Sequence, residues 1–278
     1  MQLPIPIETK LGNTFTEVEL TKPRASVLAD ANKMLETGEI FLSIKTFLSG
    51  CIESFSGEEK SITDKADIKN MVNLLPYRSA EFCFYKILVL YDPENDAIEG
   101  IYRCPRCKSQ IVTEYLKTDD LEIDTRDYLS DLDIKYMNGG EKGITLELSE
   151  PVVIKKKGSE DDVIDSIESL EFRHPTLADC LVAEKKYGVN DSIRMQFATY
   201  VEALLKVNGK EIDKKFKNNF GMFIFNNIKN ARVDLTALNE KVQQYGLDPF
   251  LEKTCRKCNK QFKSPINMSN FFVSGLDL

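Results

Sequence analysis

The sequence has a single histidine, His174, and this scarcity limits the chemistry open to the chain. Catalysis that needs two histidines is excluded, as is any metal site that takes more than one histidine from this chain. No dinucleotide-binding, phosphate-loop, H-E-x-x-H or G-x-S-x-G motif occurs either. Carboxylates are plentiful, but local spacing singles out no pair of them. The sequence therefore shows no recognisable active site.

Long apolar runs and an excess of positive charge are also missing. The most apolar stretch, 80–91, contains Glu81 and Lys86 and is shorter than the roughly 18 residues that span a bilayer. The first ten residues, MQLPIPIETK, lack the basic and apolar regions of a signal peptide. The formal charge of −7 is not that of a general nucleic-acid binder. These absences predict an intracellular protein without a membrane partner, for which nucleic acid is not the expected ligand.

The length and composition are those of a folded protein. The 278 residues suffice for one large domain or two of ordinary size. The hydrophobic fraction of 42% and the charged fraction of 29% are globular values, so global disorder is not expected.

The first part of the chain predicts a short strand followed by four helices. Residues 14–20 alternate apolar and polar side chains, as a half-buried strand does. Pro23 then opens a helical pattern that ends at Gly38. The further predicted helices span 40–52, 66–75 and 79–91, with a polar loop at 57–64. A D-P turn and a short strand at 99–102 lead into the motif C-P-R-C.

The second part repeats this order. Residues 170–175 resemble 18–23, and Thr176 with Asp179 predicts a capping box at the start of the next helix. The predicted helices span 176–187, 191–207, 211–228 and 233–245. A second D-P turn and the motif C-R-K-C follow. The distance from Pro23 to Cys104 is 81 positions and that from Pro175 to Cys255 is 80, which predicts an internal duplication.

The predicted fold is therefore α+β and mostly helical, with two duplicated strand–four-helix halves joined by a discontinuous four-cysteine module similar to a zinc ribbon. Its parts are an N-terminal half (1–118), an acidic connector with a strand or two (119–168) and a C-terminal half (169–278). The Asp-rich stretch 119–133 lacks the central Gly and closing Glu of an EF-hand loop, so it is interpreted as a solvated acidic face.

Seven cysteines occur, and three of them, Cys51, Cys83 and Cys180, lie singly in apolar helical patterns. We expect these three to pack in the core as small hydrophobic side chains. The other four form two C-x-x-C pairs: Cys104, Cys107, Cys255 and Cys258. Such a pair is half a zinc site, a redox motif or an accident. Each pair here lies on a turn before a further predicted strand, which is the pattern of a zinc knuckle.

One shared zinc site is the predicted arrangement. The 147 residues between Cys107 and Cys255 far exceed the roughly 12 to 20 of ordinary zinc modules, so spacing alone is a weak signal. However, neither pair has further ligands nearby, and two halves packed about a pseudo-twofold axis would bring the knuckles together. Four thiolates close the tetrahedral coordination of zinc, so the zinc would be structural. His174 is interpreted as a structural residue.

Basic side chains flank both knuckles and have two interpretations. They are Arg103, Arg106, Lys108, Arg256, Lys257 and Lys260. They could contact nucleic acid, or they could offset the negative charge of a zinc ion held by four thiolates. The second interpretation is favoured. The tail residues Phe271, Phe272 and Val273 are expected to pack on the protein itself rather than on a partner.

Several short motifs together resemble the baseplate hub and hub-assembly chaperone family of T-even-like tailed phages. They are LPYRSAEFCFYKI (75–87), the first C-x-x-C within GIYRCPRC, the run Arg173-His174-Pro175-Thr176, and the second C-x-x-C followed by Phe271 and Phe272. The resemblance covers most of the chain, but the stretch 119–133 and the charged turn KKKGSEDD have no counterpart in it.

The resemblance implies a non-enzymatic role in virion assembly, as a component of the central baseplate hub or as a chaperone of its assembly. The implied partners are other hub proteins, with the tape-measure protein as a further candidate. The implied location is the host cytoplasm during assembly, with the virion tail as the alternative. Two other functions stay open: a zinc-ribbon protein that binds nucleic acid or regulates, and a thiol redox enzyme.

Overall fold

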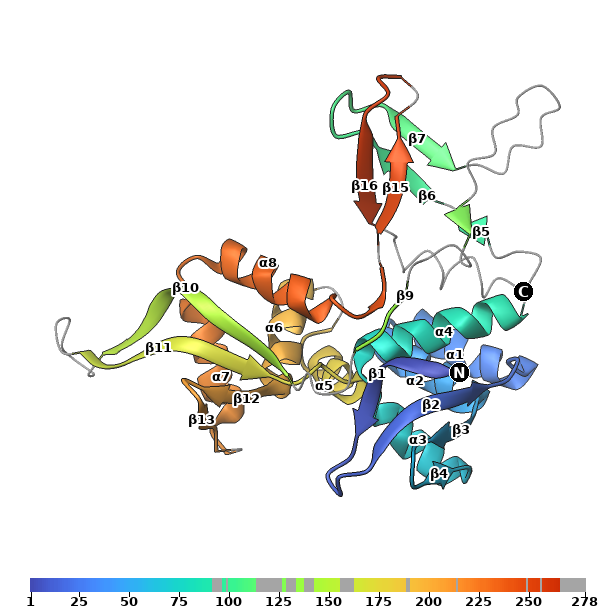
Figure 1. Cartoon of the computed structure of the whole chain (residues 1–278), viewed down its shortest axis with the longest axis horizontal. Helices are drawn as coiled ribbons and strands as arrows, with labels where there is room; N and C mark the ends of the chain where they lie inside the picture. The colour runs from blue at the N-terminus through green and yellow to red at the C-terminus, as the bar shows by residue number, and fades with distance from the viewer. Residues whose placement is uncertain are drawn as a thin grey trace.

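The computed structural model describes residues 1–91, 97–98, 100–113, 127–128, 134–137, 143–155, 163–188, 191–213, 215–248, 250–255 and 257–265. Within these ranges the chain forms an α+β fold with eight helices and several small antiparallel sheets (Figure 1). None of the helices in these ranges is long and apolar enough to cross a membrane. Most of the acidic stretch 119–133, most of the charged turn and the Phe271–Phe272 tail lie outside the described residues.

The first half folds as a four-stranded sheet with four helices. In chain order the elements are β1 (Gln2–Glu8), β2 (Thr14–Leu20), α1 (Ala25–Glu36), α2 (Ile40–Cys51), β3 (Ile52–Ser56), β4 (Ser61–Ile62), α3 (Lys65–Leu74) and α4 (Tyr77–Tyr91). The sheet has the order β1-β2-β3-β4, and all of its neighbours are antiparallel. Its apolar face and the helices enclose one core, which includes Phe15, Phe47 and Phe55.

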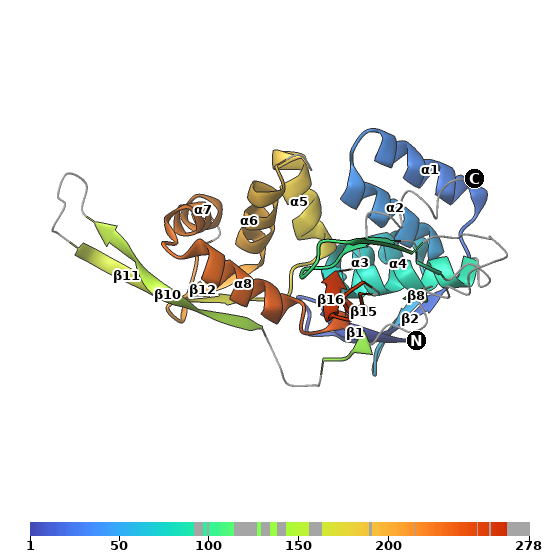
Figure 2. The same ribbon diagram turned by 90° about the horizontal axis from the view of Figure 1, so that it is seen from above.

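The second half has its own sheet and its own core. Its elements are β10 (Ile144–Lys155), β11 (Val163–Phe172), α5 (Leu177–Tyr187), α6 (Ser192–Ala203), β12 (Leu204–Val207), β13 (Lys210–Glu211), α7 (Lys217–Asn227) and α8 (Ala231–Val242). The sheet order is β10-β11-β12-β13, again antiparallel throughout. Figure 2 shows α5, α6 and α7 on one side of this sheet. The boundary expected between residues 168 and 169 falls inside β11.

Four two-stranded sheets complete the described structure. Two of them are hairpins: β6 (Gly100–Arg103) pairs with β7 (Gln110–Thr113), and β15 (Phe250–Thr254) pairs with β16 (Gln261–Pro265). The others pair β5 (Ala97–Ile98) with β8 (Asp127–Tyr128), and β9 (Ile134–Lys135) with β14 (Gly246–Leu247). Figure 1 shows the two hairpins side by side, projecting away from both halves.

The two halves share one order of elements and, over much of their length, one register. Each runs strand, strand, helix, helix, strand, strand, helix, helix, and each is followed by a cysteine-containing hairpin. The elements α1, α2, β3 and α3 begin at Ala25, Ile40, Ile52 and Lys65, and their counterparts α5, α6, β12 and α7 begin at Leu177, Ser192, Leu204 and Lys217. The offset is 152 residues at each of the four positions (177 − 25).

Most of the predicted helices are present in the structure. The capping box is confirmed, because Asp179 accepts hydrogen bonds from the main-chain N–H and the hydroxyl of Thr176. The three single cysteines are buried as expected. Burial raises the pKa of Cys51 and Cys83 to about 12, and it raises that of Cys180 further, so all three stay protonated thiols at neutral pH.

The strand content is larger than expected, because each half has a four-stranded sheet rather than one leading strand. The helix predicted over 191–207 was wrong at its end: α6 stops at Ala203 and β12 begins at the next residue. The change from α2 to β3 is equally abrupt. The junction of α6 and β12 contains no glycine or proline, so the sequence gives no signal that the helix ends there, whereas Gly50 lies just before the end of α2 and is such a signal.

The strand β1 was not predicted, because its sequence QLPIPIE contains two prolines that cannot donate ladder hydrogen bonds. It lies at the edge of its sheet, and its register with β2 shifts between Gln2 and Ile7. A side chain of α4 pairs with the residue between the two prolines: the Ser79 hydroxyl accepts from Ile5 N and donates to Ile5 O. Ser79 thereby fixes the shifted part of β1 on α4.

The halves meet around the start of α4. The main-chain N–H of Tyr77 donates to Pro175 O at 2.7 Å, and that of Leu177 donates to Leu75 O at 2.9 Å. The guanidinium of Arg78 donates to the carbonyls of Tyr245 and Leu247 and to the carboxylate of Glu81. Both side chains of this ion pair are about nine-tenths buried, at 8% and 10% exposure.

Replacing Arg78 with methionine should therefore be costly. Arg78→Met leaves the Glu81 carboxylate buried without a cation and two carbonyls without donors, so we expect a loss of about 3–5 kcal/mol in the free energy of unfolding. Arg194→Met is the matched control, since the Arg194–Asp191 pair is exposed and should be worth less than about 1 kcal/mol. Urea unfolding of both variants measures the difference, and equal midpoints would contradict the role given to Arg78.

His174 should make stability depend on pH. Its ring packs edge-on against Tyr245, its Nδ1 has no partner among the described residues, and burial lowers its pKa from 6.5 to about 4. The neutral ring favours the folded state fully above pH about 6.5, and this contribution is lost as the pH falls toward about 4. Between about pH 7.5 and 4, wild type should lose about 3 kcal/mol more than His174→Phe in urea unfolding. Equal losses would contradict the assignment.

Candidate metal centre

Two hairpin turns carry the four cysteines of the C-x-x-C motifs. In the first, Cys104 N donates to Ser109 O at 3.0 Å and Lys108 N donates to Cys104 O at 2.9 Å. In the second, Cys255 N donates to Lys260 O at 2.9 Å and Asn259 N donates to Cys255 O at 2.6 Å. The residue four positions after the first cysteine is left-handed in both turns, with φ of 59° at Lys108 and 52° at Asn259. The two turns therefore have the same backbone design.

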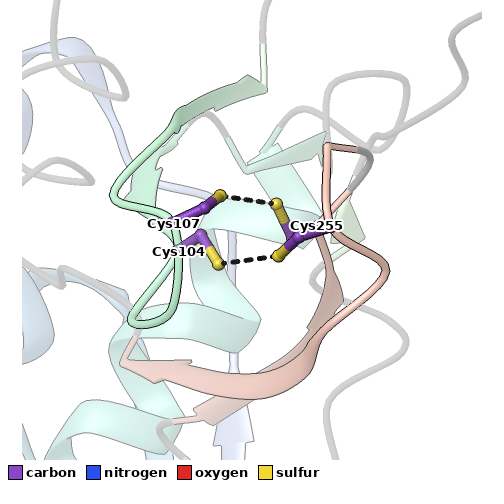
Figure 3. A group of neighbouring side chains, drawn as sticks. Cys104, Cys107 and Cys255 are labelled. Carbon is purple, nitrogen blue, oxygen red and sulfur yellow. Dashed lines mark hydrogen bonds between the residues drawn. The ribbon is translucent and has the colours of Figure 1, made fainter.

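The structure brings all four predicted residues together. One sulfur ligand atom from each of Cys104, Cys107, Cys255 and Cys258 lies within 4.8 Å of the others. Figure 3 shows the side chains of Cys104 and Cys107 pointing toward that of Cys255 on the facing hairpin. The Cys104 and Cys258 sulfurs are 3.7 Å apart, and those of Cys107 and Cys255 are 3.5 Å apart.

These distances fit a metal ion bound by four thiolates. A tetrahedral ion with metal–sulfur bonds of about 2.3 Å requires sulfur–sulfur separations of about 3.8 Å. Cys104 and Cys255 are buried and the other two are partly buried. The donor set and its spacing can therefore hold a metal ion, and no other cluster of histidine, cysteine or carboxylate ligands is found among the described residues.

The sulfur contacts are symmetric between the hairpins. The first cysteine of each motif faces the second cysteine of the other: Cys104 faces Cys258, and Cys255 faces Cys107. This reciprocal pattern is the signature of a local twofold relation. The two knuckles thus contribute to the site in equivalent ways.

Ser109 is a site residue that the sequence analysis missed. Its hydroxyl lies 3.0 Å from the Cys107 sulfur and 3.3 Å from the Cys255 sulfur. Hydrogen bonding from Ser109 is the main cause that lowers the pKa of Cys107, and it lowers that of Cys255 to about 6. A hydroxyl after a C-x-x-C motif is too common to signal this role, which becomes visible only once the second hairpin is in place.

Cys258 differs from its neighbours. A hydrogen bond from the main chain of Lys260 lowers its pKa, but burial and the three adjacent sulfur atoms outweigh that effect and raise it to about 11. Four thiolates this close together repel one another, so a cation is needed for all four to be ionised at once.

The flanking basic side chains are solvent-exposed where they are described. These are Arg103, Arg106, Lys108, Lys257 and Lys260, while Arg256 lies outside the described residues. His174 is not part of the cluster and packs against Tyr245, consistent with a structural role. Comparison with family models, with curated proteins and with solved structures finds no match to this chain.

A single shared site predicts how cysteine variants behave. Metal analysis of the purified wild type should find one ion per chain. Cys104→Ser and Cys255→Ser should each lose nearly all of it, because either change breaks the same set of four ligands. Cys51→Ala, which removes a buried thiol far from the cluster in the sequence, should keep it. Retention of half the metal in either serine variant would indicate two independent sites instead.

Proposed function

We propose that this protein is a non-enzymatic phage tail protein, a component or an assembly chaperone of the central baseplate hub, stapled by a structural zinc ion. The observation that supports a zinc ion is that four thiols from two hairpins, far apart in the sequence, lie close together. The family resemblance of the sequence motifs supports the hub role.

Zinc is the metal that best suits this donor set. Four thiolates favour zinc or an iron–sulfur cluster over harder ions. Zinc with four thiolates carries a formal charge of about −2, and the exposed lysines and arginines of both turns offset it. Because the four thiolates complete the coordination sphere, no position stays open for a water or a substrate. Such a site stabilises a fold and does not catalyse a reaction.

The zinc acts as a staple because of where its ligands lie in the chain. The ion would link the segment after α4 to the segment after α8, across the 147 residues between Cys107 and Cys255. Binding a structural zinc contributes on the order of 10 kcal/mol in small zinc modules. Removal of zinc by a chelator should therefore free the two hairpins from each other before either core unfolds.

The two halves arose by duplication of one unit. The constant offset of 152 residues at four element starts supports this, as do the identical sheet order and the matching left-handed residues in the two turns. Convergence of unrelated halves would not be expected to keep both the order of elements and the register. The duplicated unit comprises two strands, two helices, two strands, two helices and a knuckle.

Partners and location follow from the resemblance. The protein binds other hub proteins, with the tape-measure protein as a further candidate, in the host cytoplasm during assembly. It either stays in the finished tail or leaves it. A rigid, metal-stapled scaffold suits both roles.

The second candidate is a zinc-ribbon protein that binds nucleic acid or regulates. The exposed basic side chains of both turns favour it. Binding to phosphates would weaken steeply with salt. The third candidate, a thiol redox enzyme, requires C-x-x-C thiols that are free of metal.

Purification of the tagged protein from its native host during particle production tests the proposal. Stoichiometric recovery of hub or tape-measure proteins is the expected result, and analysis of finished particles then separates component from chaperone. The Cys104→Ser protein is the matched comparison, because loss of the staple should reduce recovery. Recovery of nucleic acid or transcription proteins without tail proteins would overturn the hub role in favour of the second candidate.

A further inference from the structure

A cavity of about 460 Å³ lies where the second half meets the start of α4. Its volume is in the range of roughly 300–1,000 Å³ typical of ligand sites. The second half supplies most of the polar lining, through Gln196, Thr199 and Tyr200 of α6, Asn239 of α8, and the adjacent Gln243. The first turn of α4, with Tyr77, Arg78 and Glu81, forms part of the opposite wall.

The first half has no such polar lining at the matching positions. Since α2 and α6 keep the offset of 152 residues, Ile44, Phe47 and Leu48 correspond to Gln196, Thr199 and Tyr200. All three residues of α2 are buried in the apolar core, at 6%, 1% and 0% exposure. Phe47 packs against Phe84 of α4, with ring centroids 5.0 Å apart. The same helix face is thus core in one half and a polar cavity wall in the other.

The polar side chains of the cavity form a hydrogen-bonded network in which two amides keep one end available for a ligand. The Tyr200 hydroxyl and the Gln196 Nε2 both donate to Asn239 Oδ1, the latter at 2.9 Å. Within the described residues, no protein group pairs with the other end of either amide. One amide therefore offers an acceptor and the other a donor. A peptide group, which has one N–H and one C=O, matches that pair.

The charges in the wall are already balanced. Arg78 is paired with Glu81 and with the carbonyls of Tyr245 and Leu247. Burial raises the pKa of Cys180, so its thiol is neutral. A charged ligand would find no opposite charge to pair with among the described lining residues, so the cavity favours a neutral ligand. Ile193, a lining residue that is 64% exposed, and Met195 offer apolar contact.

We infer that this cavity binds a short, neutral, extended peptide segment of a partner protein, with its main-chain amide on Gln196 and Asn239 and an apolar side chain against Ile193 and Met195. The inference deepens the proposed function, since it rests on the protein being an interaction protein and assigns a site to one of its contacts. The first half cannot bind in the same way, because Ile44 and Phe47 fill the corresponding positions.

Titration of the purified zinc-loaded protein with short peptides tests the site directly. The probes are N-acetylated, C-amidated tripeptides with leucine, phenylalanine, glutamate or lysine between two alanines. We expect the leucine and phenylalanine probes to shift the side-chain amide NMR signals of Gln196 and Asn239, and the two charged probes to bind at least tenfold more weakly. Shifts of equal size with all four probes would overturn the neutral-ligand argument.

A variant that restores the first-half residues provides the sharpest comparison. The double substitution Gln196→Ile, Thr199→Phe should fill the cavity, abolish the leucine-probe response and leave the thermal midpoint unchanged or higher. Asn239→Ala serves if the double variant does not fold, and it should weaken the probe by at least tenfold. Arg194→Ala, on the exposed side of α6, is the control and should bind like wild type.

The remaining outcomes each decide the question. No shift of these signals with any tripeptide at about 10 mM would overturn the inference. A response to glucose but to no peptide would also overturn it, in favour of a small neutral molecule. Failure of hub proteins to co-purify would refute the proposed function and leave the peptide titration intact, so the two failures can be told apart.

Discussion

Four sulfur atoms that lie within 4.8 Å of one another cannot all ionise without a cation between them, and this electrostatic constraint governs the relation between the two hairpins. Without the ion, burial and the adjacent sulfurs raise the pKa of Cys258 to about 11, so this thiol stays protonated at neutral pH. With it, 147 intervening residues become a closed loop. An ion can link the two turns only if both present their thiols in the same way. This explains why Lys108 and Asn259 share the left-handed conformation.

The symmetry of the two knuckles does not extend to the contact between the two halves. At the sulfurs, each first cysteine meets the other turn's second cysteine, so the contact is reciprocal. At the contact between the halves, Leu75 and Tyr77 meet Pro175 and Leu177, and these are not corresponding positions of the two halves. One half contributes the start of its fourth helix and the other the start of its first. A pseudo-twofold axis therefore describes the knuckles and not the whole molecule.

The sequence could predict what depends on local pattern. Helix positions, the Thr176–Asp179 cap and the buried single cysteines follow from periodicity and capping chemistry. It could not predict β12, because Leu204 continues directly from a helix without a breaker, nor β1, whose two prolines argue against a strand and whose Ile5 is paired by Ser79 of a distant helix. The end of α2 had one local signal, Gly50, which the predicted helix over 40–52 passed over. The four cysteines were identifiable from the repeated motif, whereas Ser109 and the cavity depend on contacts between segments far apart in the chain.

The two halves share a backbone register but differ in the side chains on one helix face. Backbone register is constrained, since a shift of one residue in α6 would move every side chain that packs on the second sheet and would displace the strand that follows without a linker. Side chains on the face toward α8 are less constrained, because they border a cavity, whose other wall includes the ion pair of Arg78 and Glu81, rather than a packed sheet. At this face the second half has the polar Gln196 and Thr199, where the first half has the buried Ile44 and Phe47.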